Sequence, residues 1–243
     1  MKKLKADLHI HTSEDPEDLI KYSAVQLIDM AADLGYQVIS ITNHNAVTWN
    51  NYLRDYAKER GIILIPGIEA TIEGRHVLIY NADFSQIDRN KVSSLASLKN
   101  SQSLIVAPHP FFPSTVALRG LFKKNIHLFD AVEFSHFYTK NINFNQKAKK
   151  IANQHDLPII GTSDAHQRIQ FHSTYSLIEA EFHPQAVIEA IKQHKVEVVT
   201  NPLSLSALTK ILCTMGWRNE VVKRCQTLRG HSKGSFLTKK TFR

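Results

Sequence analysis

Short apolar runs of strand length alternate with segments of helical periodicity through most of the chain. Ser23 and Pro184 stand where helices typically begin, and Gly35 and Gly61 stand where helices typically end. Strands that alternate with helices favour an α/β fold with a parallel sheet. Strands are predicted over residues 6–11, 37–42, 62–68, 76–80, 104–107, 131–134, 158–161 and 197–199, and helices over residues 24–34, 49–60, 92–100, 117–123, 145–155 and 184–194.

Residues of the kind that bind metals follow nearly every predicted strand, and this distribution distinguishes two forms of parallel sheet. An open, doubly wound sheet binds its ligands at one crevice. A closed barrel instead gathers the loops after all of its strands on one rim. Because the strands fall short of eight regular βα units, we predict an α/β chain folded as a distorted (β/α)7 barrel.

The alternation of strands and helices ends near residue 200, where Asn201-Pro202 marks a turn. A segment with the spacing of an amphipathic helix follows, and residues 230–243 are polar and expected to be loose. The apolar positions of this helix are Leu205, Leu208, Ile211, Leu212 and Met215.

The formal charge of +8 arises in the C-terminal part of the chain. Residues 205–243 hold nine Lys or Arg and one acidic residue, whereas the 21 basic and 21 acidic residues of 1–204 cancel. We therefore predict a neutral catalytic domain over 1–204 and a short, basic, partly helical extension over 205–243. Such an extension is most often a solvated terminus, and the alternative is a patch for nucleic acid or an anionic membrane surface.

Several features bear on the compartment in which the protein works. No run of about 18 uncharged apolar residues occurs, so a membrane-spanning helix is not expected. The first residues lack an apolar signal segment, and two cysteines, Cys213 and Cys225, do not suggest a disulfide scaffold. We expect a cytoplasmic protein, and the sequence does not indicate its oligomeric state.

The motif Asp7-Leu8-His9-Ile10-His11 carries the strongest chemical signal. Side chains alternate in a strand, so Asp7, His9 and His11 are predicted to share one face. Two imidazoles and a carboxylate buried together without a partner would be strongly unfavourable. A divalent cation would offset this unfavourable burial, because imidazole and carboxylate are among its usual ligands.

Further ligand-type residues stand beside predicted strands and turns, where a barrel would bring them to the same rim. One of these motifs repeats the spacing of an acid and a histidine two residues apart. The residues are His44 after Asn43, Glu69 after Pro66-Gly67, His76 in a predicted strand, His109 between two prolines, and the pair Asp164 and His166.

These spaced motifs, in this order, resemble those of the polymerase-and-histidinol-phosphatase (PHP) superfamily. Its members look like distorted barrels of seven βα units that bind two or three metal ions. The resemblance runs over residues 5–166, with a further helix and strand to residue 199. The chain departs from many relatives at Asn43, where they carry aspartate, and at His136, where asparagine is more frequent.

The resemblance implies a site for two or three divalent ions, with zinc, iron and manganese all compatible with a thiolate-free donor set. Glu69 would bridge two ions. The acid after the first strand is most plausibly Asp15, with Glu14 and Asp18 as rivals. The implied ligands are His9, His11 and Asp164 for the first ion, His76 and His109 for the second, and Asp15, His44 and His166 for the third.

The implied activity is hydrolysis of phosphomonoesters or nucleotides through a metal-bound hydroxide. His44 or His166 could donate the proton to the leaving group. Arg168 is the first choice for phosphate recognition, with Lys140 and Arg119 as alternatives. The partner would be a small phosphorylated substrate. A nuclease that trims DNA or RNA ends, aided by the basic extension, and a non-catalytic metal-binding module are the alternatives.

Three side chains around these motifs have less definite roles. His136 is predicted to contact substrate. Phe111 and Phe112 follow a ligand motif and could stack on a base, although core packing or loop anchoring explains them equally well.

Overall fold

The computed structural model describes residues 3–211, 213 and 214 of the chain. Its strands are β1 (Lys3–Ile10), β2 (Val38–Ile41), β3 (Ile63–Leu64), β4 (Gly67–Ile72), β5 (Arg75–Tyr80), β6 (Leu104–Ala107), β7 (Ala131–Ser135), β8 (Ile159–Thr162), β9 (Thr174–Glu179) and β10 (Val196–Thr200). Its α-helices are α1 (Ala24–Asp33), α2 (Asn51–Glu59), α3 (Leu95–Leu98), α4 (Gly120–Lys124), α5 (Asn145–Gln154) and α6 (Pro184–Lys192), and its 3-10 helices are η1 (Phe84–Gln86), η2 (Val92–Ser94) and η3 (Ile126–Leu128).

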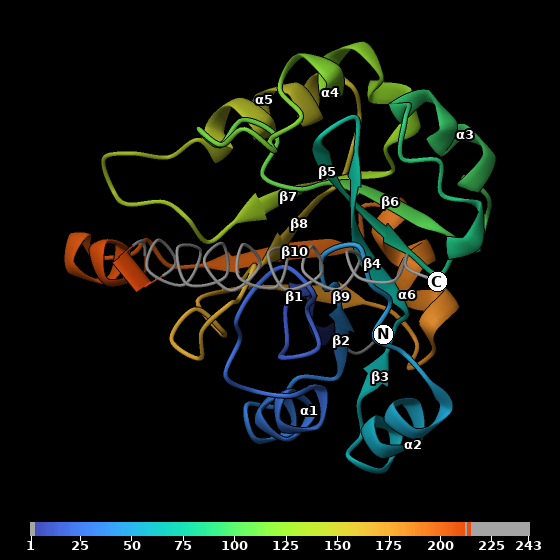
Figure 1. Ribbon diagram of the computed structural model, residues 1–243, viewed down its shortest axis with the longest axis vertical. Coiled ribbons are helices and arrows are strands. Elements are labelled where there is room, and N and C mark those ends of the chain that lie inside the picture. The colour runs from blue at the N-terminus through green and yellow to red at the C-terminus, as the bar shows by residue number, and fades with distance from the viewer. Residues whose placement is uncertain (1–2, 212, 215–243) are drawn as a thin grey trace, which may run out of the picture.

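The described strands form two five-stranded sheets, in the orders β10-β9-β1-β2-β3 and β4-β5-β6-β7-β8. Helices α1 and α2 lie beside the first sheet, and α3, α4 and α5 cover the second (Figure 1). Strands β1, β2 and β3 run parallel, as do β6, β7 and β8, while β4 pairs with β5 and β9 with β10 in antiparallel fashion. The predicted α/β class is confirmed.

Two isolated parallel bridges join the two sheets. Ile10 pairs with Ala165, and His44 pairs with Glu69. The described strands therefore form two bridged sheets, and not the continuous closed ring that a regular (β/α)7 barrel requires. The bridges nevertheless bring the carboxyl ends of β1, β2 and β8 to one rim, and this convergence positions the site.

The helix boundaries follow local signals in the sequence. The Ser23 side chain accepts a hydrogen bond from the Gln26 backbone N–H, and the Gln26 side chain accepts one from the Ser23 N–H, which forms a capping box. Pro184 occupies the first turn of α6. Gly35 and Gly61 follow α1 and α2 with φ of 72° and 70°, the left-handed conformation that ends helices.

Two strands differ from the prediction for identifiable reasons. The expected strand over 62–68 is divided into β3 and β4 on either side of Ile65–Pro66, since proline cannot donate to a ladder. Strand β9 was not expected, because its fully buried positions include Thr174 and Ser176. The Ser176 hydroxyl accepts from the Gly161 N–H at 2.9 Å and donates to the Gly161 carbonyl at 3.0 Å.

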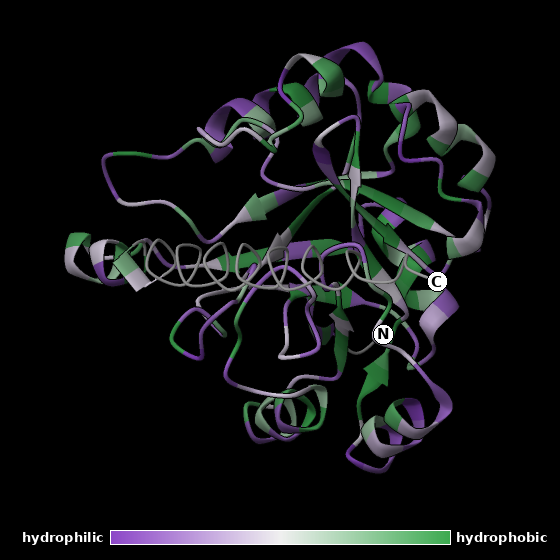
Figure 2. Cartoon of the chain, viewed as in Figure 1, coloured by the Kyte–Doolittle hydropathy of each residue, from purple (hydrophilic) through white to green (hydrophobic). Residues whose placement is uncertain are grey.

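Three clusters of apolar side chains build the core of the described residues. One lies between the two sheets and under α6, one lies under α3, α4 and α5, and one lies under α1 and α2. Figure 2 shows hydrophobic strands at the centre, with hydrophilic residues on the outer sides of the helices. Burial of the strands on both faces explains their nearly continuous apolar runs.

The C-terminal prediction lies mostly outside the described residues. Residues 205–211 are helical, as expected, whereas Leu212, Met215 and the remainder of the basic extension are not described. Among the described residues, no helix has the length and apolar character required to cross a membrane.

Candidate metal centre

Strand β1 delivers the first two imidazoles to the rim. Asp7, His9 and His11 are fully buried, and His11 directly follows the strand. The Asp7 carboxylate accepts hydrogen bonds from the backbone N–H groups of His9 and Ser163, and burial raises its pKa to about 7. Asp7 thus links β1 to the loop after β8. Its carboxylate makes no hydrogen bond to an imidazole nitrogen of the described residues.

The orientation of His9 and His11 identifies which of their nitrogens are free to bind. Nδ1 of His9 donates to Glu133 Oε1 at 2.6 Å, and Nδ1 of His11 donates to Asp15 Oδ2 at 2.9 Å. A carboxylate oxygen only accepts, so the neutral rings present lone pairs on Nε2. The two Nε2 atoms face each other at 3.2 Å, and each lies 3.3 to 3.4 Å from Glu69 Oε2 and Asp164 Oδ1.

Four lone-pair donors that face one another need a positive charge between them. Two atoms bound at about 2.1 Å to one tetrahedral ion lie roughly 3.4 Å apart, close to the separations observed here. The donors also match zinc, iron or manganese in chemical type. His9, His11, Glu69 and Asp164 therefore fit a divalent ion.

Glu69, on β4, presents its two oxygens to two different groups of imidazoles. Oε2 lies 3.3 Å from Nε2 of His9 and of His11, and 3.1 Å from Nε2 of His44. Oε1 lies 2.7 Å from His76 Nδ1 and 3.4 Å from His109 Nε2. One buried carboxylate thus stands between two donor sets, which is the arrangement of a bridging ligand.

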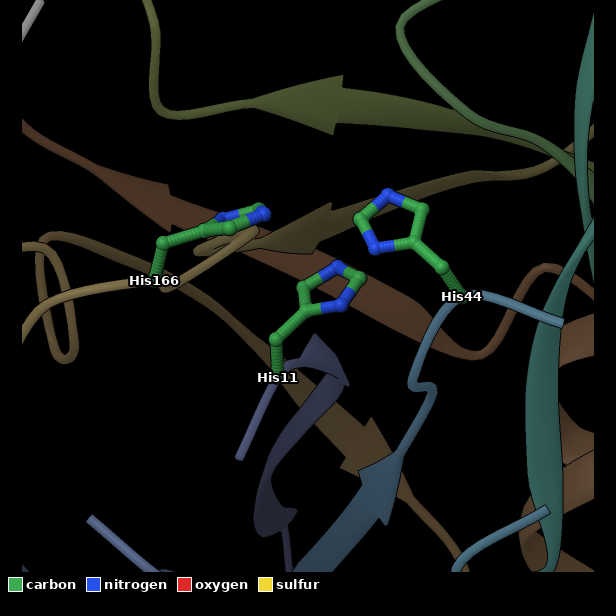
Figure 3. Close-up of side chains that lie close together, drawn as sticks. All are labelled: His11, His44 and His166. Carbon is green, nitrogen blue, oxygen red and sulfur yellow. The ribbon is translucent and has the colours of Figure 1, made fainter. Parts of the chain in front are cut away.

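His44 and His166 complete a third group with His11, as Figure 3 shows. The three side chains come from the ends of β1, β2 and β8, and their rings converge on a common space. The His11 ring stacks at 4.4 Å from that of His44 and at 4.2 Å from that of His166. One nitrogen from each imidazole can lie within 4.8 Å of the other two, so this group could also hold an ion.

The three acids after β1 that the sequence offers as candidate ligands occupy distinct positions. Glu14 accepts a hydrogen bond from the backbone N–H of Ala24 at the start of α1. Asp15 Oδ2 accepts from Nδ1 of both His11 and His44, at 2.9 Å each, and so orients these rings. Asp18 Oδ2 lies 3.0 Å from His166 Nε2 and lines the central cavity.

Glu133, on β7, is a site residue that the sequence motifs do not reveal. Its Oε1 accepts hydrogen bonds from His9 Nδ1 and the Thr162 hydroxyl, and its Oε2 accepts one from the His109 backbone N–H at 2.6 Å. Carboxylates that hold ligand histidines in this way fix the ring and its tautomer. An acid inside the apolar strand Ala131–Ser135 was the available signal, because a buried charge requires partners.

The electrostatics of the centre also require positive charge. Burial disfavours protonation of His9 and His11, yet the neighbouring carboxylates outweigh it and raise the pKa of both imidazoles well above its ordinary value. Burial likewise opposes ionisation of Glu69 and Asp164, and the surrounding histidines nevertheless lower the pKa of both carboxyl groups. Protons or metal ions must therefore compete for the same nitrogens.

A cavity of about 250 Å³ opens above these residues. Polar ligand-type groups form its floor, and Phe112, Val116 and Phe137 form an apolar wall. Arg168 and Lys140 are exposed and are not among the residues that line it. The lining residues are Asp18, His44, Glu69, His76, His109, Phe112, Ser114, Val116, Phe137, Asp164 and His166.

His136 lies behind this wall and does not line the cavity. It is fully buried, its ring lies 4.0 Å from that of Phe137, and its Nε2 is 3.2 Å from the Gln170 side-chain nitrogen. Burial lowers the pKa of His136 to about 3, so the ring is neutral and accepts the Gln170 hydrogen bond.

Comparisons with known proteins show which sequences and folds this chain is similar to. A family model described as PHP-associated matches residues 143–196. An uncharacterized protein of Methanocaldococcus jannaschii is 29% identical over 133 residues, which cover 47% of this chain and 72% of that protein.

Two solved structures share the fold. A two-domain protein of Bacteroides vulgatus, which contains a predicted PHP-like metal-dependent phosphoesterase, matches with a TM-score of 0.64 and 20% identity over 88% of this chain and 70% of its own. PsfC of Pseudomonas syringae matches with a TM-score of 0.61 and 14% identity over 91% of this chain and 100% of its own. The chain thus contains a PHP-associated segment and shares the fold of these two structures.

Proposed function

We propose that the protein is a metal-dependent hydrolase of phosphoesters, with phosphomonoesters or nucleotides as substrates. One observation carries the proposal: the two oxygens of Glu69 face two separate sets of imidazole nitrogens at the floor of an open cavity. Such paired cation sites are suited to phosphoryl chemistry, in which both the attacking and the leaving oxygen need charge stabilisation.

The proposed ligands follow the three donor groups. His9, His11 and Asp164 would hold one ion and His76 and His109 a second, with Glu69 shared between them. His44 and His166 would hold a third. The sequence favours Asp15 as the acid of the third group, but its hydrogen bonds to His11 and His44 favour an orienting role, and Asp18 is the acid that we propose beside His166.

The residues of this chain would divide the chemistry among them. When bound, divalent ions supply Lewis acidity and lower the pKa of coordinated water toward neutrality. His44 and His166 line the cavity and could pass a proton to the leaving oxygen where they are not held as ligands. Phe112 and Phe137 would exclude bulk water from one side, which strengthens electrostatic interactions inside the cavity.

Phosphate recognition is proposed for exposed cations near the rim. Arg168 follows His166 by two residues, and Lys140 follows β7. Both would have to swing toward the cavity to reach a substrate, since neither lines it. His136 could act on substrate only indirectly, through Phe137, against which its ring packs, or through Gln170, from which it accepts a hydrogen bond. We further propose residues 1–204 as the catalytic domain and residues 205–243 as its basic extension.

A metal-depletion experiment tests the proposal. Protein stripped with a chelator should lose hydrolysis of a phosphoester panel and regain it with manganese, zinc or iron. His11→Ala and Asp164→Asn should abolish turnover and leave the fold intact by circular dichroism. His127→Ala and Asp156→Asn make the same chemical changes at exposed positions and should retain activity.

Two results would count against the proposal. A full complement of metal without turnover on any phosphoester would refute hydrolysis. Fewer than one ion per chain after reconstitution would instead favour a non-catalytic module on this fold.

A further inference from the structure

Charge is strongly segregated within the part of the chain before residue 205. Residues 89–155 hold ten Lys or Arg and only two acidic residues, whereas the rest of 1–204 holds eleven basic and nineteen acidic residues. The basic stretch forms β6 and β7, two strands of the second sheet, and the helices α3, α4 and α5, which cover that sheet (Figure 1). The neutral sum of 1–204 therefore hides a basic segment of the chain.

This basic segment lines a groove between α4, α5 and the segment after β6, with a volume of about 610 Å³. Among the described residues, its lining includes Arg119, Lys123 and Lys147 and no acidic residue. Phe111 and Phe144 lie among these cations, and Lys147 Nζ is 4.7 Å from the centre of the Phe111 ring. We call these five residues the basic groove.

The basic groove adjoins the metal centre through one short segment. His109 lines the central cavity, and its carbonyl accepts a hydrogen bond from the Phe112 N–H at 3.0 Å. The Phe112 ring lines the cavity on one side and lies 5.8 Å from the Phe144 ring of the groove. A polymeric ligand lying in the groove would therefore be separated from the cavity only by the rings of Phe112 and Phe144.

We propose that the basic groove binds the phosphate backbone of a single-stranded nucleic acid whose end enters the cavity. The inference rests on the proposed function and names the substrate class of the same site. Cations interleaved with aromatic rings suit a single strand, which presents phosphates and unpaired base faces together. A small phosphomonoester would be held within the cavity and would leave this groove unused.

The test measures binding of the full-length protein to a fluorescein-labelled oligothymidylate of about ten nucleotides. Binding is detected by fluorescence anisotropy, and a chelator is present so that the oligonucleotide is not cleaved. The groove variant is Lys123→Gln with Lys147→Gln. The control is Lys58→Gln with Lys195→Gln, which removes two exposed lysines elsewhere. Lys58 matches Lys123 because both stand in the last turn of a helix.

The expected effect follows from counterion release. Each single-strand phosphate contact contributes about 0.7 to the slope of log K against log salt, so loss of two contacts should lower the slope by about 1.4. At about 0.1 M salt this corresponds to roughly 25-fold weaker binding. The control should bind like the wild type. A groove variant that binds like the control, or a control that weakens equally, would overturn the proposal.

Two further measurements distinguish a failure of this inference from a failure of the proposed function. Metal-loaded groove variant should hydrolyse a mononucleotide at the wild-type rate, since the cavity is unchanged. If wild type hydrolyses no phosphoester while the groove variant still loses oligonucleotide binding, the proposed function fails and the groove stands. If the groove variant loses binding to anionic phosphatidylserine vesicles but keeps oligonucleotide binding, a membrane surface is the ligand and the inference fails.

Discussion

Replacement of Glu133 by glutamine tests how the centre is held together. Both Glu133 oxygens accept hydrogen bonds, from His9 Nδ1 and the Thr162 hydroxyl on one side and from the His109 N–H on the other. Glutamine has the same shape but turns one acceptor into a donor. In either orientation of the amide, the His9 N–H or the His109 N–H loses its acceptor.

The magnitude follows from these contacts. A buried donor without a partner costs about 1–3 kcal/mol. Loss of a carboxylate that orients a ligand histidine weakens metal binding by about 10- to 100-fold, equivalent to about 1.4–2.7 kcal/mol. The two ranges overlap, so Glu133→Gln should reduce metal affinity by 10- to 100-fold although every proposed ligand is retained.

The assay measures bound metal by elemental analysis after equilibration in zinc or manganese buffers, with circular dichroism as the check on folding. Glu59→Gln, at an exposed position near the end of α2, is the matched control and should bind metal like the wild type. Wild-type affinity in folded Glu133→Gln would refute the reasoning, because His9 would then keep its orientation without the carboxylate.

Three other predictions address the rest of the molecule. In the metal-free protein, the raised pKa of the buried histidines contributes stability that is complete below about pH 6.5 and is lost as the pH rises above it. The lowered pKa of the carboxyl groups contributes stability that is lost as the pH falls below about 4.3. The melting temperature should therefore be highest near pH 5–6. An optimum above pH 7 without metal would contradict this. Gly161→Ala would put a methyl 2.7 Å from the Tyr175 carbonyl oxygen and should lower the free energy of urea unfolding by about 1–3 kcal/mol, whereas Gly120→Ala meets no heavy atom within 4 Å and should change it little. Asp18→Asn should reduce bound metal by about one ion per chain, and an unchanged metal content would remove Asp18 from the proposed third site.

The sequence predicted the elements of the fold because its strands are buried on both faces and its helices carry capping signals. It missed β9 because Thr174 and Ser176 fill buried positions that a hydrophobic pattern would leave unrecognised. It also could not show that the strands divide into two sheets. That division depends on the break at Pro66 and on two single bridges, which leave no periodic signal.

The motifs predicted which histidines meet, because strand alternation and the shared rim fix their positions. The convergence of His9, His11 and Asp164 follows from these local rules. The roles of the acids depended instead on side-chain direction. Asp15 accepts hydrogen bonds from the Nδ1 atoms of two imidazoles, and spacing alone could not distinguish this role from that of a metal ligand. Glu133 contacts His9 from a strand more than a hundred residues later, and spacing alone could not distinguish it from a core residue.

Metal stoichiometry tests the central claim most directly. Purified protein should be reconstituted with zinc or manganese, freed of loosely bound ions, and analysed for ions per chain. The bridging position of Glu69 predicts at least two ions in the wild type and fewer in Glu69→Gln, with His127→Ala unchanged. A wild-type content below one ion per chain, or an undiminished content in Glu69→Gln, would contradict the account.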